Sequence, residues 1–386
     1  LTMRLLCRNF DIFEFHEYTQ GSSLLAFGLT ALSLHGLLGD SVDVKRTAAV
    51  HFLRHVQNGY IATNSYHNAI HAADVAQTLH VFMVASIIER LSLRPLEVFA
   101  LLIAACVHDF KHPGVNNEFM IRSQSDLALT YNDVGVLENM HCAEAFRICK
   151  HDPRANIFED FSRASVRAVR KLIVSAVLGT DMTHHFKKLA EFTATVAAEA
   201  EVAQELYISE GGDSGGACNS KLKLDDAQRL LAVTVCLHAA DVSNPAKAPA
   251  VYKRWAYRVM DEFFLQGDQE AASGNDVSAF MDRSNPQPVK CQVGFIDYIV
   301  HPMFESLHAL IPSIKPVVDA NFADNRMWLA SPGCFSDLPL DSVTGRYEAE
   351  NRVGHAAITP ISGEASESAG SPLPIAGRGA GSAAVE

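Results

Sequence analysis

Apolar residues recur at intervals of three and four along most of the chain, which is the spacing of one face of an α-helix. Residues 44–59 give the clearest case, because Val50, Leu53 and Val56 share a face and Gly59 supplies a helix C-terminus. We see no alternation typical of a β-strand and no internal repeat. We therefore predict an all-α fold, with further helices in residues 11–15, 24–38, 75–91, 95–108, 136–141, 162–179, 186–208, 230–237, 251–266 and 291–302. Two more predicted helices follow, and Trp328 lies in the last of them.

The composition fits one large domain followed by a tail. With 386 residues, 48% of them apolar, the chain is long enough to bury a real core, and we expect residues 1–353 to form one domain. Residues 354–386 are rich in Ser, Ala, Gly and Pro and bury too little apolar surface to offset their ordering entropy, so we predict a disordered tail. The glycine-rich residues 211–216 are expected to form a surface loop.

Charge, cysteine content and the length of apolar runs narrow the class of protein. The formal net charge of −12 argues against a nucleic-acid binder, and an anionic substrate would need a local positive centre such as metal ions. The eight cysteines form no C-x-x-C pair, which indicates a reduced, cytoplasmic protein. The longest wholly apolar run, residues 98–107, is too short to span a bilayer, and we see no signal peptide. The chain begins Leu-Thr-Met, as an excised domain with a regulatory domain elsewhere would.

Residues with metal-binding side chains stand at the ends of apolar helices. His108-Asp109 follows residues 98–107, Asp241 follows residues 230–237, and His71 lies near the start of another helix. Taken singly, each has an ordinary explanation, such as polar capping of a helix end or a solvated helix face. Together, two imidazoles and two carboxylates from three segments can enclose one divalent ion. If Asp109 bridges, a second ion can lie about 3.5–4 Å away, as in two-metal phosphoryl transfer.

Longer motifs carry a family resemblance. They are Tyr66-His67-Asn68-x-x-His71-Ala72-Ala73-Asp74-Val75, His108-Asp109-x-x-His112-Pro113-Gly114, Tyr131-Asn132-Asp133, Leu137-Glu138-Asn139, Thr180-Asp181-Met182 and Gln292-Val293-Gly294-Phe295-Ile296-Asp297-Tyr298. By their order and spacing over roughly residues 15–335, the chain resembles the catalytic domain of a class I 3′,5′-cyclic-nucleotide phosphodiesterase of the cAMP-preferring type. The resemblance implies a compact, multi-helix, single catalytic domain of the HD metal-phosphohydrolase superfamily.

The resemblance also implies roles for individual residues. His71, His108, Asp109 and Asp241 would hold the tighter metal ion, expected to be Zn²⁺, and Asp109 would also bind a second ion, expected to be Mg²⁺ or Mn²⁺. His67 matches the general acid. The positions around the second ion match His112, Glu138, Thr180 and Asp181, and the substrate pocket matches Gln292 at the purine edge, Phe295 and Val259 on either side of the ring, and Tyr66 and Asn244.

Two of these positions have structural alternatives. Asp181 is also a suitable N-cap for the helix that follows it. Val259 belongs to an apolar stripe with Trp255 and Phe263, and such stripes are more often core than pocket.

The implied reaction is hydrolysis of a 3′,5′-cyclic nucleotide to the 5′-monophosphate, which would end cyclic-nucleotide signalling. A water activated by two metal ions would attack phosphorus, and His67 would protonate the leaving 3′ oxygen. Asn244 resembles the residue at this pocket position in cAMP-preferring members, which implies a preference for cAMP. The Gln292 amide has a donor end and an acceptor end and can serve adenine or guanine, so dual specificity stays open. Met140 stands where the family often has histidine, which weakens a contact around the second ion but removes no ligand.

Two other functions stay open at this point. One is a different helical metal phosphohydrolase, acting on nucleoside triphosphates or linear phosphodiesters, which would not need the purine clamp of residues 292–298. The other is a catalytically silent cyclic-nucleotide sensor, which would be expected to lack a metal ligand or the general acid. The sequence is also compatible with a homodimer.

Overall fold

The computed structural model describes residues 10–39, 42, 44–211, 220–341 and 343–352. Within these residues the chain forms helices and no β-strand, which confirms the all-α prediction. The predicted tail, and all but the first residue of the predicted loop 211–216, lie outside the described residues. The α-helices are α2 (Ile12–Tyr18), α3 (Ser23–Leu34), α4 (Arg46–Gly59), α5 (Ala69–Phe82), α6 (Ile88–Arg90), α7 (Pro95–Val107), α8 (Asn117–Arg122), α9 (Asp126–Tyr131), α10 (Val136–His151), α11 (Arg163–Val177), α12 (His185–Phe192), α13 (Ala198–Ser209), α14 (Asp226–Asp241), α15 (Pro249–Ala272), α16 (Pro288–Phe295), α17 (His301–Leu310), α18 (Lys315–Leu329) and α19 (Glu348–Asn351).

Side-chain caps start several helices where the sequence predicts them. Asp11 caps α2 and Ser162 caps α11, while Pro95 occupies the first turn of α7. The Asn68 side chain accepts the backbone N–H groups of Ile70 at 2.9 Å and of His71 at 3.3 Å. This cap determines where α5 begins and therefore where the first turn of α5 places its histidine.

One predicted helix end is wrong. The helix expected to stop near Pro302 continues through the π turn η6 (Ile296–Val300) into α17 and ends at Leu310. Proline has no backbone N–H and its ring collides with the preceding turn of a regular helix. Here Pro302 lies in the first turn after the π turn, whose wider winding accommodates the ring.

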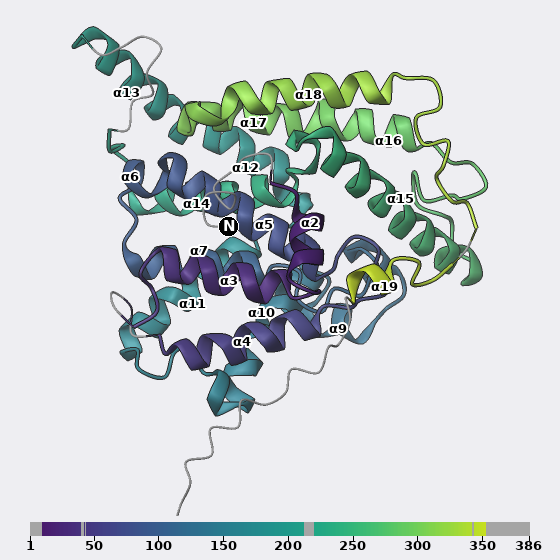
Figure 1. Cartoon of the computed structure of the whole chain (residues 1–386), viewed down its shortest axis with the longest axis horizontal. Helices are drawn as coiled ribbons and strands as arrows, with labels where there is room; N and C mark the ends of the chain where they lie inside the picture. The colour runs from purple at the N-terminus through teal and green to yellow at the C-terminus, as the bar shows by residue number, and fades with distance from the viewer. Residues whose placement is uncertain (1–9, 40–41, 43, 212–219, 342, 353–386) are drawn as a thin grey trace, which may run out of the picture. The chain divides into compact units, whose positions relative to one another are not determined.

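The core is built around α5 (Figure 1). All 14 residues of α5 are buried, and so are the ten consecutive residues 98–107 of α7. α7 packs against α5 and α11, and α14 packs against the same two helices. The π turn η1 (Met83–Ile87) joins α5 to α6, so residues 69–90 form one helix whose length and composition would suit a membrane span. Because 83% of its apolar window is buried inside the protein, it has the properties of a core helix.

The last described helix, α19, fastens the 60–68 loop, which joins α4 to α5 (Figure 1). The Asn351 amide donates to the backbone carbonyls of Ala62 at 2.8 Å and of Asn64 at 2.9 Å. Nη1 of Arg258, on α15, donates to the Asn351 side-chain oxygen at 2.9 Å and to the Ser65 carbonyl at 3.0 Å. The loop is therefore held by two elements that come much later in the chain.

The close packing of α15 gives a stability prediction. A Cβ on Gly267 would lie 1.9 Å from the carbonyl oxygen of Met281, and a backbone atom cannot swing aside as a flexible side chain can. We expect Gly267→Ala to lower the free energy of unfolding by about 1–3 kcal/mol, although alanine is the better helix former.

Gly294→Ala in α16 is the matched control, because a Cβ there meets only Tyr298, at 4.0 Å. We expect this variant to be neutral or more stable by up to about 1 kcal/mol. Chemical denaturation followed by circular dichroism measures both, and equal destabilisation of the two variants would contradict the packing argument.

Candidate active site

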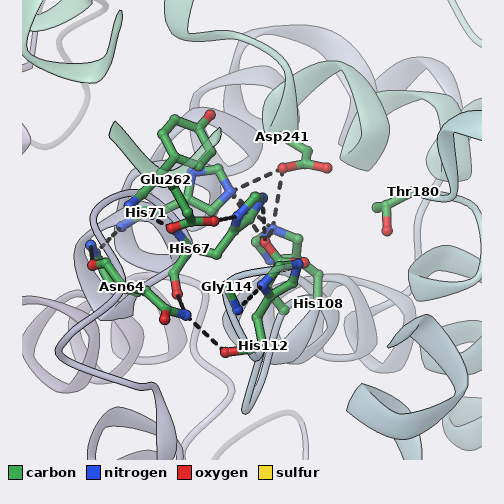
Figure 2. Close-up of polar contacts among 12 residues, drawn as sticks. Asn64, His67, His71, His108, His112, Gly114, Thr180, Asp241 and Glu262 are labelled. Atoms are coloured by element: carbon green, nitrogen blue, oxygen red, sulfur yellow. Dashed lines mark hydrogen bonds and ion pairs between the residues drawn. The ribbon is translucent and has the colours of Figure 1, made fainter. Parts of the chain in front are cut away.

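Four side chains from three helix ends converge on one point (Figure 2). His71 lies in the first turn of α5, His108-Asp109 directly follows α7, and Asp241 is the last residue of α14. His71 Nε2 lies 3.0 Å from Asp241 Oδ1 and 3.4 Å from Asp109 Oδ2. His108 Nε2 lies 3.2 Å from Asp109 Oδ2 and 3.3 Å from Asp241 Oδ1. The structure thus brings the four predicted metal ligands together, and we call them the His–Asp cluster.

The donor set of the His–Asp cluster fits a divalent metal ion. The Nε2 atoms of His71 and His108 are 3.3 Å apart, and the four ligand atoms all lie within 4.8 Å of one another. Ligands about 2.0–2.1 Å from a tetrahedral zinc ion are roughly 3.3 Å apart, so little movement is needed. His108 Nδ1 donates to the Ala105 carbonyl at 2.9 Å, which in the neutral ring directs the lone pair of Nε2 into the site.

Charge pairing allows two carboxylates to lie side by side in this buried site. Burial alone would raise the pKa values of Asp109 and Asp241, but the charge of His108 and hydrogen bonds from His108 and His71 hold both well below their usual range. The two carboxylates in turn overcome the effect of burial on His108 and raise its pKa well above the ordinary value. A metal ion would take over this compensation, so its binding should release the His108 proton.

His67 lies beside the His–Asp cluster and is paired with a buried glutamate. Its Nδ1 is hydrogen-bonded to Oε1 of Glu262, whose other oxygen accepts the backbone N–H groups of Tyr66 at 2.8 Å and of His67 at 3.0 Å. Burial lowers the pKa of His67, but the charge and hydrogen bond of Glu262 and the charges of Asp109 and Asp241 outweigh burial and raise the pKa to about 9. His67 Nε2 lies 4.0 Å from Asp109 Oδ2. A protonated ring facing the cluster is suited to general acid catalysis.

Two neutral imidazoles accompany His67. The ring of His112 stacks on that of His67, with centroids 4.0 Å apart, and its Nδ1 accepts the backbone N–H of Gly114 at 3.0 Å. His141 Nε2 lies 3.7 Å from Asp109 Oδ1. Burial lowers the pKa of His112 well below its ordinary value and that of His141 to about 4, so both rings are neutral at pH 7.

Glu138 and Asp181 lie close to one glycine. A Cβ on Gly135 would be 3.6 Å from Glu138 Oε2 and 3.9 Å from Asp181 Oδ2. Burial, with the charges of Asp181 and Asp109, raises the pKa of Glu138 to about 7. Asp181 also accepts the backbone N–H of Thr183 at 2.9 Å and caps the short helix η3 (Met182–His184), as its structural alternative predicts.

Thr180 is the predicted residue that lies farthest from the others in the close-up (Figure 2). Its hydroxyl donates to the Val177 carbonyl at 2.8 Å, and the figure shows no contact between it and the His–Asp cluster. Thr180 therefore makes a local hydrogen bond just after the end of α11.

The predicted pocket residues fall into two groups. Asn244 Nδ2 donates to the Tyr66 hydroxyl at 3.0 Å, while the buried Asn244 Oδ1 has no hydrogen-bond partner. The Gln292 side-chain oxygen accepts the Tyr252 hydroxyl at 3.1 Å. Two residues, Phe295 and Val259, are half-buried and pack against the main core. Val259 therefore packs partly in the core, as its structural alternative predicts, and part of the residue stays accessible to solvent.

Comparison with known proteins identifies the family. The family described as 3'5'-cyclic nucleotide phosphodiesterase matches residues 66–321. The chain belongs to this family. It is 36% identical over 323 residues to the 3′,5′-cyclic-AMP phosphodiesterase, isoform F, of Drosophila melanogaster, which covers 83% of this chain and 46% of that protein. It is 35% identical over 323 residues to the 3′,5′-cyclic-AMP phosphodiesterase 4C of Rattus norvegicus, covering 83% of this chain and 57% of that protein. The matched segment covers between 25% and 57% of the length of five curated relatives, these two among them.

Sequence reasoning missed three contributors to this phosphodiesterase-family site. Glu262 and Tyr252 both lie on α15, where the apolar stripe indicates core. His141 lies within α10, and the sequence pattern assigns it no role. A signal for Glu262 does exist, because Asp261-Glu262 places two acids inside a helix that is otherwise packed. Asp261 is buried too and accepts the Ser65 hydroxyl, so both acids fasten the 60–68 loop.

The pairing of Glu262 with His67 gives a prediction for titration. Glu262→Gln removes the charge that holds the proton on His67, while burial of the ring remains. We therefore expect the pKa of His67 to fall from about 9 to its ordinary value of about 6.5 or lower, measured by NMR on metal-free protein.

Glu205→Gln, at an exposed position on α13, serves as the matched control. This variant should leave the His67 titration unchanged. A pKa for His67 that is the same in Glu262→Gln and in the unaltered protein would show that Glu262 does not set it.

Proposed function

We propose that this chain hydrolyses 3′,5′-cyclic nucleotides to nucleoside 5′-monophosphates, with cAMP favoured, and so ends cyclic-nucleotide signals. The observation that carries the proposal is the His–Asp cluster with a protonated histidine beside it. Metal ions bound by the cluster would place positive charge beside a phosphate ester. His67 can supply the proton that a leaving alkoxide requires. Both relatives named above are 3′,5′-cyclic-AMP phosphodiesterases, which supports the same substrate class.

The metal ions are proposed to be Zn²⁺ in the His–Asp cluster and Mg²⁺, or Mn²⁺, beside it. Asp109 would contact both ions, because its Oδ2 faces His71 and His108 and its Oδ1 faces the other way, toward His141. Bound ions would supply the positive charge that acidifies a water and offsets the charge developing on the phosphoryl oxygens. The waters around the second ion would be held by His112, Glu138, Thr180 and Asp181.

His67 is proposed to give its proton to the 3′ oxygen as the bond from phosphorus to that oxygen breaks. Glu262 holds the ring at Nδ1, so Nε2 is left to point at the cluster. The neutral His112 stacks on the ring and restricts its rotation without adding a competing charge. The ring leaves the reaction neutral and recovers its proton from solvent.

The preference for cAMP is proposed to arise from Asn244 and Gln292. The unpaired Asn244 Oδ1 is a buried acceptor, which suits the exocyclic amino group of adenine and would face the carbonyl oxygen of guanine unfavourably. Tyr252 holds the Gln292 side-chain oxygen and so leaves its amino group free to donate to the purine. Phe295 and Val259 would contact the two faces of the ring, and Tyr66 would close the pocket beside Asn244.

We further propose a cytoplasmic protein whose regulatory regions lie outside these residues, with a homodimer as its assembly. The relatives are longer than the matched segment, which leaves room in them for such regions.

The experiment that tests the function is hydrolysis of cAMP and of cGMP, measured separately with Mg²⁺, before and after treatment with a chelator. We expect turnover that chelation abolishes and that added Zn²⁺ and Mg²⁺ restore, with the higher kcat/KM for cAMP. No turnover of either nucleotide by metal-loaded protein would reject the proposal and favour a silent sensor.

Asp241→Ala should lower metal content and reduce kcat/KM by at least about 100-fold, since a direct ligand matters at least as much as the residues that orient ligands. Helical content should be kept, because Asp241 is the last residue of α14. Asp226→Ala, an exposed aspartate at the other end of α14, is the control and should keep full turnover.

His67→Ala should keep both metal ions and lower kcat by about 10²–10⁴-fold, the usual contribution of a general acid. The pH profile gives an independent check with a fixed sign. Because the acid form is required, activity should fall as pH rises through the pKa of His67, and this alkaline limb should move to lower pH in Glu262→Gln. Unchanged kcat in His67→Ala would remove His67 from the mechanism.

A further inference from the structure

A second group of metal-binding side chains lies on α17 and α18, outside the residues of the active site. On α17, His301, Glu305 and His308 are four and three residues apart and share one face. His308 Nδ1 lies 3.8 Å and His301 Nε2 lies 3.9 Å from Oε1 of Glu305. The ligand atoms of Glu305, His308 and Asp319, from α18, all lie within 4.8 Å of one another.

His308 is the unusual member of this group. Its ring is only 6% exposed, and neither of its nitrogens has a hydrogen-bond partner. Buried polar atoms are nearly always paired, and an exception often marks a place for a bound ion or water. Burial and the charge of Lys315 lower the pKa of His308 to about 4, so the ring is in the neutral form that binds metals.

The carboxylates of this group already attract a cation. Lys315 Nζ lies 3.4 Å from Glu305 Oε1 and 3.1 Å from Asp319 Oδ2, and both carboxylates raise the pKa of Lys315. This ammonium satisfies the two acids but leaves both nitrogens of His308 unpaired. The Lys315 side chain is 47% exposed, so its flexible stem can carry the charge out to water.

We propose that Glu305, His308 and Asp319 form a site for a divalent transition-metal ion of the zinc class, with His301 as the fourth ligand, and that the ion displaces Lys315. Mixed imidazole and carboxylate ligands suit zinc better than calcium or magnesium, which prefer oxygen alone. Little movement of the helices is required, because the ligand atoms of Glu305, His308 and Asp319 already lie within 4.8 Å of one another. His301 lies outside that group, with its Nε2 3.9 Å from Glu305 Oε1, and would join it by a rotation of its side chain.

The proposed ion would connect α17 and α18 close to the helix that carries two of the predicted pocket residues. α17 is the continuation, through η6, of the helix that carries Gln292 and Phe295. A metal bridge to α18 would therefore brace the far end of this helix. The proposal does not depend on the hydrolysis proposed above, because none of its ligands belongs to the active site.

The test is the zinc content of the full chain after removal of all metal and equilibration with buffered Zn²⁺. We expect His308→Gln and Asp319→Asn each to bind one zinc ion fewer than the unaltered protein. His151→Asn, which changes an exposed histidine on α10, is the matched control and should lose none. The Asp319 side chain is 43% exposed, so its variant keeps the test valid if His308→Gln folds poorly.

Equal zinc content in the unaltered protein and in a folded Asp319→Asn variant would overturn the proposal. Repeating the comparison with Asp241→Ala in every chain separates the two sites, and the difference of one ion should persist there. Zinc that depends on His308 but not on Asp241 would support this site even if the active-site proposal failed.

Lys315→Ala tests the displacement itself. Removing the competing ammonium should tighten zinc binding by up to about fivefold, the upper end of the range expected for an exposed ion pair. Zinc binding that is weaker or unchanged in Lys315→Ala would show that the lysine does not occupy the position of the ion.

Discussion

Compensation of buried negative charge is the constraint on which this structure depends. Asp109 and Asp241 place two like charges against the same imidazoles, and neither could stay ionised there without nearby positive charge. Each lies at the C-terminal end of an apolar helix, where unpaired carbonyls make the local potential negative as well. The packing of α7 and α14 in the core therefore keeps the two carboxylates close together in spite of their mutual repulsion.

The same constraint recurs around the centre. Asp74 is buried, and it accepts Lys247 at 2.8 Å on one oxygen and the Trp255 indole N–H at 3.0 Å on the other. Glu262 is buried and is satisfied by His67 and two backbone N–H groups. Each of these buried acids therefore has its partners, and such paired networks are rigid. The ligand positions thus depend on charge pairs as much as on apolar packing.

Much of this arrangement could be predicted from the sequence, because its chemistry coincides with helix ends. His108 and Asp241 stand where apolar periodicity stops, and the sequence alone shows that change. Glu262 could not be recognised in the same way, since it lies inside a helix whose pattern indicates core. The continuation past Pro302 depends on a π turn that has no clear pattern of its own. The contact of Asn351 with the 60–68 loop is decided by tertiary packing, and local periodicity carries no information about it.

The attachment of that loop by α19 also bears on how the protein is made. Asn351 bonds a carbonyl 289 positions earlier in the chain, so the loop that carries His67 leaves the ribosome long before the residue that fastens it. All four residues of the His–Asp cluster have been synthesised once α14 is complete, whereas the hydrogen bonds from Asn351 to the 60–68 loop can form only after α19 has emerged. A chain that ended before Asn351 would therefore keep the metal ligands but lose two of the hydrogen bonds that hold the 60–68 loop beside them.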